Sequence, residues 1–115
     1  MPQPRRFGQV IGLAEESIAE YIRVHREVWP EVLEQIERSH ITNYSIFLRR
    51  LPDGNNYLFS YFEYKGTDFD MDMEAMAADP KTQEWWAICG PMQRPLEDRG
   101  PSAWWAEMEE VFHHD

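Results

Sequence analysis

Three side chains with complementary chemistry lie at four-residue intervals: Tyr21, His25 and Trp29. Residues four apart follow one another along one side of an α-helix, so a phenol, an imidazole and an indole share one face. An imidazole titrates near pH 6.5, so His25 can donate or accept a proton at neutral pH. His25 is therefore a candidate acid–base catalyst. The competing interpretation is a half-buried histidine at the edge of the core.

Other aromatic residues could form the wall of a sugar pocket, because sugars present apolar C–H faces together with hydroxyl edges. The candidates are Tyr44, which opens an apolar segment, and the adjacent pair Trp85 and Trp86. Neighbouring side chains on a helix point about 100° apart, so both indoles cannot lie deep in one small core. We expect at least one of them to face a pocket or a partner subunit. Each of these residues is equally compatible with an ordinary core role.

Motifs for metals, nucleotides and nucleophiles are absent from the sequence. It contains no HExxH, CxxC, GxGxxG, P-loop or GxSxG pattern. His113 and His114 are adjacent, so in a strand their rings would face opposite sides and make a poor shared metal site. The acidic segment 68–74 lacks the glycine and spacing of an EF-hand loop and is interpreted as the exposed start of a helix. We therefore expect neither a metal nor another cofactor.

Composition limits the classes of partner. The 115 residues are enough for one domain, 1–115, with one core. The formal net charge of −10 disfavours nucleic acid and anionic membranes and favours a neutral substrate over a phosphorylated one. Cys89 is the sole cysteine, which excludes a disulfide framework within the chain and a Cys-rich zinc site. The first ten residues lack the apolar core of a signal peptide, and no apolar run approaches the ~18 residues of a membrane span, so we expect a cytoplasmic protein.

Hydrophobic periodicity predicts the elements that position these residues. Apolar residues recur at steps of three and four from Ile18 to Ile36, which predicts an amphipathic helix. Pro30 lies inside this stretch. Proline costs a helix interior roughly 3 kcal/mol and biases the preceding residue away from helical geometry, so we expect a break or kink there.

The remaining predicted strands and helices complete the order of secondary structure along the chain. Asp-Gly within the turn 52–55 is a hairpin signal between two apolar segments. The predicted strands are 6–13, 43–50, 56–64 and 108–113. Two further helices are predicted, one at 71–80 that is stopped by Pro80 and one at 81–92. The segment 93–105 is predicted to be an ordered loop. The order β-α-β-β-α-β predicts an α+β, ferredoxin-like antiparallel sheet with helices on one face. We expect the other face to pack on a second copy, giving a homodimeric α/β barrel.

Four segments together resemble the L-rhamnose mutarotase family. They are EYIRVHREVWPEV, NYSIFL, EWW and EVFHHD, and they match the family's Y-x-x-x-H-x-x-x-W-P-E helix, its strand beginning N-Y, its paired tryptophan and its terminal E-V-F strand. The resemblance extends from about Phe7 to His113. The combination is specific, whereas W-P-E alone would be a weak signal.

The resemblance implies a dimeric ferredoxin-like isomerase that interconverts the α and β anomers of L-rhamnose without cofactor or metal. It assigns to His25 the role of catalytic proton donor, the acid on ring opening and the base on closing, and it assigns sugar binding to Tyr21, Tyr44, Trp85 and Trp86. The segments 65–76 and 93–105 depart from the family pattern, which leaves L-fucose, another 6-deoxy-L-hexose, as an alternative substrate. Two further alternatives are a small monooxygenase with His25 as axial haem ligand, and a sugar-binding dimer without catalysis.

Overall fold

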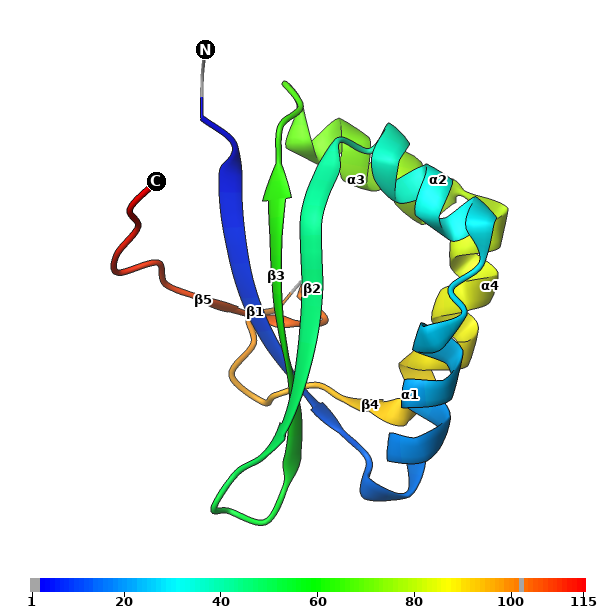
Figure 1. Ribbon diagram of the computed structural model, residues 1–115, viewed down its shortest axis with the longest axis vertical. Coiled ribbons are helices and arrows are strands. Elements are labelled where there is room, and N and C mark those ends of the chain that lie inside the picture. The colour runs from blue at the N-terminus through cyan, green and yellow to red at the C-terminus, as the bar shows by residue number, and fades with distance from the viewer. Residues whose placement is uncertain (1–2, 102) are drawn as a thin grey trace.

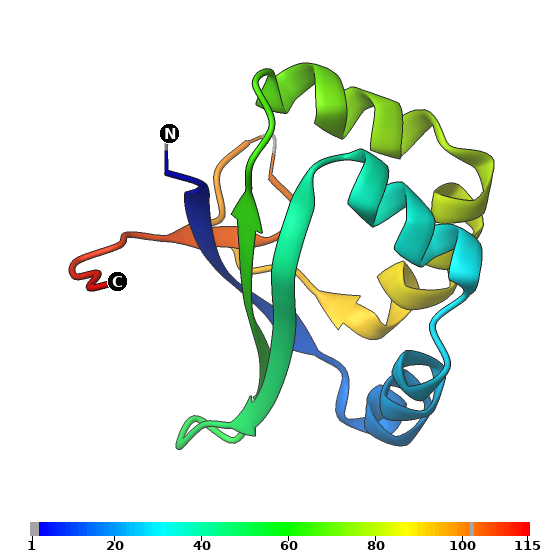
Figure 2. The ribbon, with the colours of Figure 1, turned by 45° about the horizontal axis from the view of Figure 1, so that its top comes forward.

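Helices cover one face of a curled antiparallel sheet (Figures 1 and 2). The computed structural model describes residues 3–101 and 103–115. The strands are β1 (Arg5–Leu13), β2 (Ile41–Arg50), β3 (Asn56–Tyr64), β4 (Gln93–Arg94) and β5 (Ala106–Met108). The helices are α1 (Ile18–Arg26), α2 (Pro30–Arg38), α3 (Phe69–Ala78) and α4 (Pro80–Cys89), with short 3₁₀ turns at Glu15–Ser17 and Gly90–Met92. Within the described ranges, no helix is both long and apolar enough to cross a membrane.

The sheet order is β2-β3-β1, and β4 and β5 both pair with the free edge of β1. This arrangement confirms the predicted α+β, ferredoxin-like class and the order of its main strands. The two-residue strand β4 was not predicted. It approaches β1 so closely at Gly12 that an added Cβ would lie 2.7 Å from the Arg94 carbonyl oxygen, which explains a glycine inside this strand.

The prediction for the last strand was wrong in position. Pairing with β1 begins at Ala106 opposite Val10 and ends at Met108 opposite Gly8, whereas the sequence predicted a strand over 108–113. The chain beyond Met108 has no regular structure, and Glu110 forms a 2.8 Å ion pair with Arg6 of β1. The apolar residues of this segment, Val111 and Phe112, therefore do not take part in strand pairing within the subunit.

The two prolines in helical stretches both begin a helix. Trp29 is extended, with φ −60° and ψ 135°, and Pro30 is the first residue of α2, so the predicted break is confirmed. The same holds for Pro80: the preceding helix α3 ends at Ala78, as predicted, and Pro80 itself begins α4. There the Asp79 carboxylate accepts a 2.9 Å hydrogen bond from the Thr82 backbone N–H. At the first helical position a missing N–H costs nothing, because that donor has no partner inside the helix.

The core between sheet and helices consists of two apolar clusters. The first contains Ile11 and Leu58 of the sheet together with residues of α1, α2 and α4. The second centres on Phe62 and Tyr64 of β3. Between them lies a cross-strand pair, Gln9 on β1 opposite Ser60 on β3, whose side chains face the helices. Polar residues therefore interrupt the helix-facing surface of the sheet at its middle.

Candidate active site

Four aromatic residues meet where α1 ends, α2 begins and α4 passes beside them. The rings of Tyr21 and His25 are stacked, with centroids 4.1 Å apart and planes inclined by 23°. Trp85 of α4 meets the His25 ring edge-on at 5.2 Å and the Trp29 ring at 5.3 Å. The aromatic residues predicted to share a helix face therefore do lie together. Helix α4 adds Trp85, one of the two candidate tryptophans, to this cluster.

One nitrogen of His25 is held by the backbone. Its Nδ1 lies 2.8 Å from the carbonyl oxygen of Tyr21. A carbonyl oxygen only accepts hydrogen bonds, so Nδ1 carries the hydrogen, and in the neutral ring Nε2 holds a free lone pair. Burial of the ring lowers the pKa of His25 below 6.5, and the bond to the Tyr21 carbonyl opposes this only in part. His25 is therefore neutral at pH 7, with Nε2 ready to accept a proton.

The break before Pro30 places Trp29 in this cluster. A continuous helix would have carried Trp29 one turn beyond His25, parallel to it. The extended residue instead turns the chain, so that Trp29 and His25 contact the same indole, that of Trp85. The ammonium group of Lys81 lies 5.8 Å above the Trp29 ring, a cation–π contact at the rim of the cluster.

A β-bulge directs Tyr44 toward the helices. The register of β2 against β3 shifts between Thr42 and Ser45, where two residues of β2 oppose one of β3. Asn43 supplies the required left-handed backbone, with φ 50°, and its side-chain amide donates a 3.0 Å hydrogen bond to Glu63. Without the extra residue, Tyr44 would share the outward face of Thr42. With it, the Tyr44 ring packs 5.4 Å from Phe62 on the helix-facing side.

Hydroxyl and thiol groups from separate elements converge between sheet and helices. Burial raises the pKa of the Tyr44 hydroxyl to about 12, with a smaller contribution from Cys89 of α4, although the residue as a whole is 42% exposed. Burial also raises the pKa of Tyr21, with smaller contributions from Cys89 and Tyr44. Near this region the Ser60 Oγ is buried and finds no hydrogen-bond partner among the residues that the structure describes. Such an orphaned group favours a site that a polar ligand completes.

The adjacent tryptophans have different environments. Trp85 is 7% exposed and belongs to the first core cluster, whereas Trp86 is 46% exposed on the outer side of α4. The sequence predicted this division but not which residue would be inside. The structure joins Tyr21, His25 and Trp85 by ring contacts and brings the hydroxyl of Tyr44 close, while Trp86 lies at the surface.

Sequence reasoning missed two residues that contact this site, Gln93 and Trp104. The buried amide of Gln93 donates a 3.2 Å hydrogen bond from Nε2 to the hydroxyl oxygen of Tyr21. The indole Nε1 of Trp104 donates a 2.7 Å hydrogen bond to Gln93 Oε1. The one signal in the sequence was the second tryptophan pair, 104–105, at the end of an otherwise polar loop.

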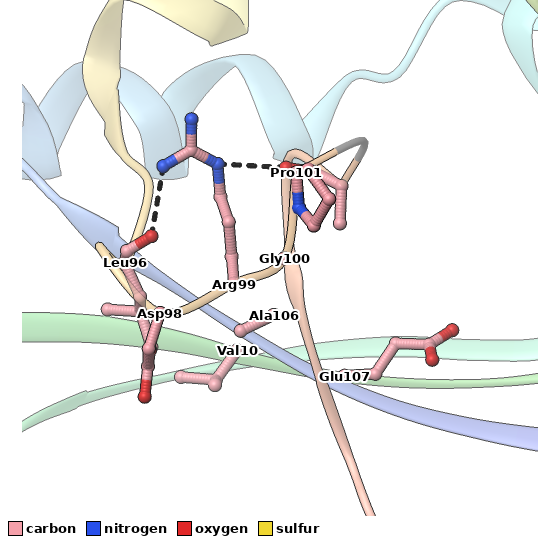
Figure 3. Close-up of a pocket in the computed structure, with 9 residues that line it drawn as sticks. Val10, Leu96, Asp98, Arg99, Gly100, Pro101, Ala106 and Glu107 are labelled. Carbon is pink, nitrogen blue, oxygen red and sulfur yellow. Dashed lines mark hydrogen bonds between the residues drawn. The ribbon is translucent and has the colours of Figure 1, made fainter.

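A cavity of about 430 Å³ lies elsewhere, between β1, β5 and the loop residues 96–101 and 103 (Figure 3). Val10 lines it, and because Ile11 points into the core, Val10 faces the side of the sheet away from the helices. The Arg99 guanidinium beside it donates hydrogen bonds to the carbonyl oxygens of Leu96 and Ala103, which braces the loop. No residue of the His25 cluster lines this cavity.

Metal ligation has no support in the described part of the chain. Among residues 3–101 and 103–115, no group of three or more His, Cys, Asp or Glu side chains is arranged to hold a metal ion. The site instead offers one titratable imidazole, buried hydroxyl groups and aromatic faces. That combination suits proton transfer on a small, polar, uncharged ligand with apolar faces.

Comparison with known proteins decides the family. A model of the L-rhamnose mutarotase family matches residues 6–114. The chain belongs to the L-rhamnose mutarotase family. It is 32% identical to the L-rhamnose mutarotase of Lactiplantibacillus plantarum over 110 residues, which are 96% of this chain and 98% of that one. It is 35% identical to the L-rhamnose mutarotase of Opitutus terrae over 97 residues, which are 84% and 86% of the two chains.

A solved structure supports the fold independently. The crystal structure of an L-rhamnose mutarotase from Formosa agariphila superposes with a TM-score of 0.71, at 22% identity, over 96% of this chain and 99% of that one. The resemblance to L-rhamnose mutarotases is therefore confirmed over nearly the whole chain. Membership of this family also separates the chain from the small monooxygenases, which were considered because of the similar architecture.

Proposed function

We propose that this protein is an isomerase that interconverts the α and β anomers of L-rhamnose. The observation that carries the proposal is the match to the L-rhamnose mutarotase family over residues 6–114, together with a neutral imidazole held among aromatic rings. The net charge of −10 suits an uncharged sugar better than a phosphorylated one.

Mutarotation requires two proton transfers. As the ring opens, the anomeric hydroxyl loses its proton, the bond between C1 and the ring oxygen breaks, and the ring oxygen gains a proton. The C1–C2 bond then rotates, and closure on the other face of the aldehyde reverses both transfers. Protons balance at every step, so the reaction needs general acid–base groups and no redox partner.

We assign the role of catalytic base during opening, and of acid during closure, to His25. Its neutral state at pH 7 and its free Nε2 support acceptance of the anomeric proton first. This reverses the order that the resemblance suggested, in which histidine acts as the proton donor on opening. The group that protonates the ring oxygen is then a hydroxyl, and Tyr21 and Tyr44 are the candidates whose hydroxyls lie between sheet and helices.

Tyr21, Tyr44, Trp85 and Trp86 remain the proposed sugar-binding residues. The orphaned Ser60 hydroxyl supports a polar ligand between the two core clusters. The exposed indole face of Trp86 is available to a C–H face of the sugar or to a partner subunit.

The decisive experiment is proton NMR with saturation of one anomeric signal of L-rhamnose in the presence of catalytic amounts of protein. We expect saturation to appear on the other anomer, faster than without protein. The same measurement with L-fucose separates the two 6-deoxy-L-hexoses. Binding of either sugar without saturation transfer would support a sugar-binding dimer in place of an enzyme, and no response to either sugar would contradict the proposal.

We further propose that the protein is a homodimer in which a second copy covers the sheet face opposite the helices. Exposed apolar side chains support this: Phe47 on that face is 63% exposed, and Val111 and Phe112 of the C-terminal segment are 88% and 80% exposed. We expect sedimentation equilibrium to give twice the chain mass of 13.7 kDa. A mass of one chain at micromolar concentration would contradict the dimer.

The whole chain is proposed to act as one mutarotase-like domain in the cytoplasm, without a nucleic-acid partner. The acidic charge supports the absence of nucleic-acid binding, and the buried, unpaired Cys89 is compatible with a reducing compartment.

A further inference from the structure

A chain of two hydrogen bonds connects the C-terminal loop to Tyr21. Trp104 Nε1 lies 2.7 Å from Gln93 Oε1, and Gln93 Nε2 lies 3.2 Å from the Tyr21 hydroxyl oxygen. The three residues come from the loop before β5, from β4 and from α1. Gln93 is 8% exposed, so its amide has little access to water as an alternative partner.

The direction of this chain follows from the chemistry of its first member. An indole N–H can only donate, so the atom of Gln93 that faces Trp104 must be the amide oxygen. The amide nitrogen then faces Tyr21 and donates to its hydroxyl oxygen. A flipped amide would place two donors against each other at Trp104, so Trp104 determines the orientation of Gln93.

The orientation of Gln93 in turn determines what Tyr21 can do. Because the Tyr21 oxygen accepts from Gln93, its own hydroxyl hydrogen points elsewhere, and no acceptor for it is found among the described residues. Tyr21 stacks on His25, so its ring lies beside that of the proposed base. A phenol with a raised pKa stays protonated throughout the neutral range.

We propose that Gln93 and Trp104 are positioning residues that make Tyr21 a hydrogen-bond donor to the sugar. This rests on the proposed mutarotase function and deepens it, since it selects Tyr21 as the group opposite His25 at the two oxygens of the opening ring. Tyr21 presents hydrogen to one sugar oxygen, and His25 Nε2 accepts from the other. A loop that departs from the family pattern thereby takes part in preparing the site.

The sharpest test is Gln93→Glu, which changes one group at constant shape. An ionised carboxylate accepts from both Trp104 and Tyr21, so the Tyr21 hydrogen is drawn away from the sugar. Burial raises the pKa of such a carboxyl, and its protonated form can again donate to Tyr21. We expect anomer exchange about tenfold slower than in the unmodified protein at pH 8, with the ratio of the two rates recovering as the pH is lowered. A ratio that is constant with pH would overturn the proposal.

A pair of matched variants tests Trp104. Trp104→Phe removes the donor that orients Gln93, whereas Trp105→Phe makes the same change at a residue that packs against the core. We expect exchange to slow about three- to tenfold in the first and to stay within about twofold in the second. Equal rates in the two variants would contradict the role of Trp104.

A spectroscopic measurement separates failure of this inference from failure of the proposed function. The protein has five indole N–H groups, and the ¹H–¹⁵N resonance lost in Trp104→Phe identifies that of Trp104. In Gln93→Glu it should move downfield, because a carboxylate is the stronger acceptor. An unmoved resonance would overturn the hydrogen-bond chain whether or not L-rhamnose is a substrate. If the resonance moves but the unmodified protein exchanges no anomers, the mutarotase function fails, and with it the role of Tyr21 as donor to the sugar.

Discussion

Replacement of His25 by alanine is expected to slow catalysed anomer exchange by about 10²–10⁴-fold, the usual contribution of positioned proton transfer. The residue is half-buried and stacks on Tyr21, so the variant should still fold. His25→Asn should lose as much, since its amide can replace the donor to the Tyr21 carbonyl but cannot accept a proton in the neutral pH range. Saturation-transfer NMR with L-rhamnose measures both rates, and circular dichroism verifies the fold.

The control for this variant is His114→Ala, which removes an exposed imidazole from the C-terminal segment. We expect its exchange rate to match that of the unmodified protein. Unchanged exchange in His25→Ala would remove His25 from the mechanism.

The pH profile of the unmodified protein tests the same assignment. The neutral imidazole is the active form, and burial lowers its pKa below 6.5. Activity should therefore be constant above about pH 6.5 and decrease only as the pH falls through the lowered value. A decrease on raising the pH from 6 to 8 would instead indicate that protonated His25 starts the reaction.

The second large effect is expected on stability, at Trp85. This indole is 7% exposed, belongs to the first core cluster and contacts both His25 and Trp29. Trp85→Ala should lower the free energy of unfolding by about 3–5 kcal/mol, because it removes a large buried ring and leaves a cavity. Urea denaturation followed by circular dichroism measures this at one fixed protein concentration, since the stability of the proposed dimer would depend on concentration.

Trp86→Ala is the matched control one residue away. Its side chain is 46% exposed, so we expect a loss of about 0.5–1 kcal/mol at most. Equal destabilisation by the two substitutions would contradict the difference in burial. If Trp86→Ala alone destabilised the protein at low concentration, the exposed indole would belong to a subunit interface.

Local patterns in the sequence determined most of the secondary structure. The three- and four-residue steps from Ile18 to Ile36 predicted the helical stretch, and Pro30 predicted its interruption. The Asp-Gly turn between two aromatic segments predicted the hairpin of β2 and β3. These predictions succeed because backbone dihedral preferences and side-chain period depend on residues within a few positions of each other.

One expectation failed because it depended on the rest of the fold. The segment 108–113 was predicted to be the last strand, but the chain leaves β1 after Met108. Pro80 was expected to end a helix, and α3 does end just before it, at Ala78. What the local pattern did not predict is that Pro80 itself begins α4, because Asp79 caps the new helix and proline tolerates the first position. A local pattern indicates which secondary structure a segment can form, but not which other segment of the fold it will pair with or pack against.

The features of the candidate site can likewise be separated into those that the sequence determined and those that the tertiary structure decided. The sequence alone determined that Tyr21 and His25 share a helix face, since four-residue spacing on a helix fixes that relation. Only the tertiary structure decided that Trp85 and not Trp86 enters the cluster, that a bulge turns Tyr44 inward, and that Gln93 and Trp104 reach Tyr21. The physical reason is that these contacts join residues far apart in the chain. Packing and hydrogen bonding across elements, which no local period encodes, determine which of them meet.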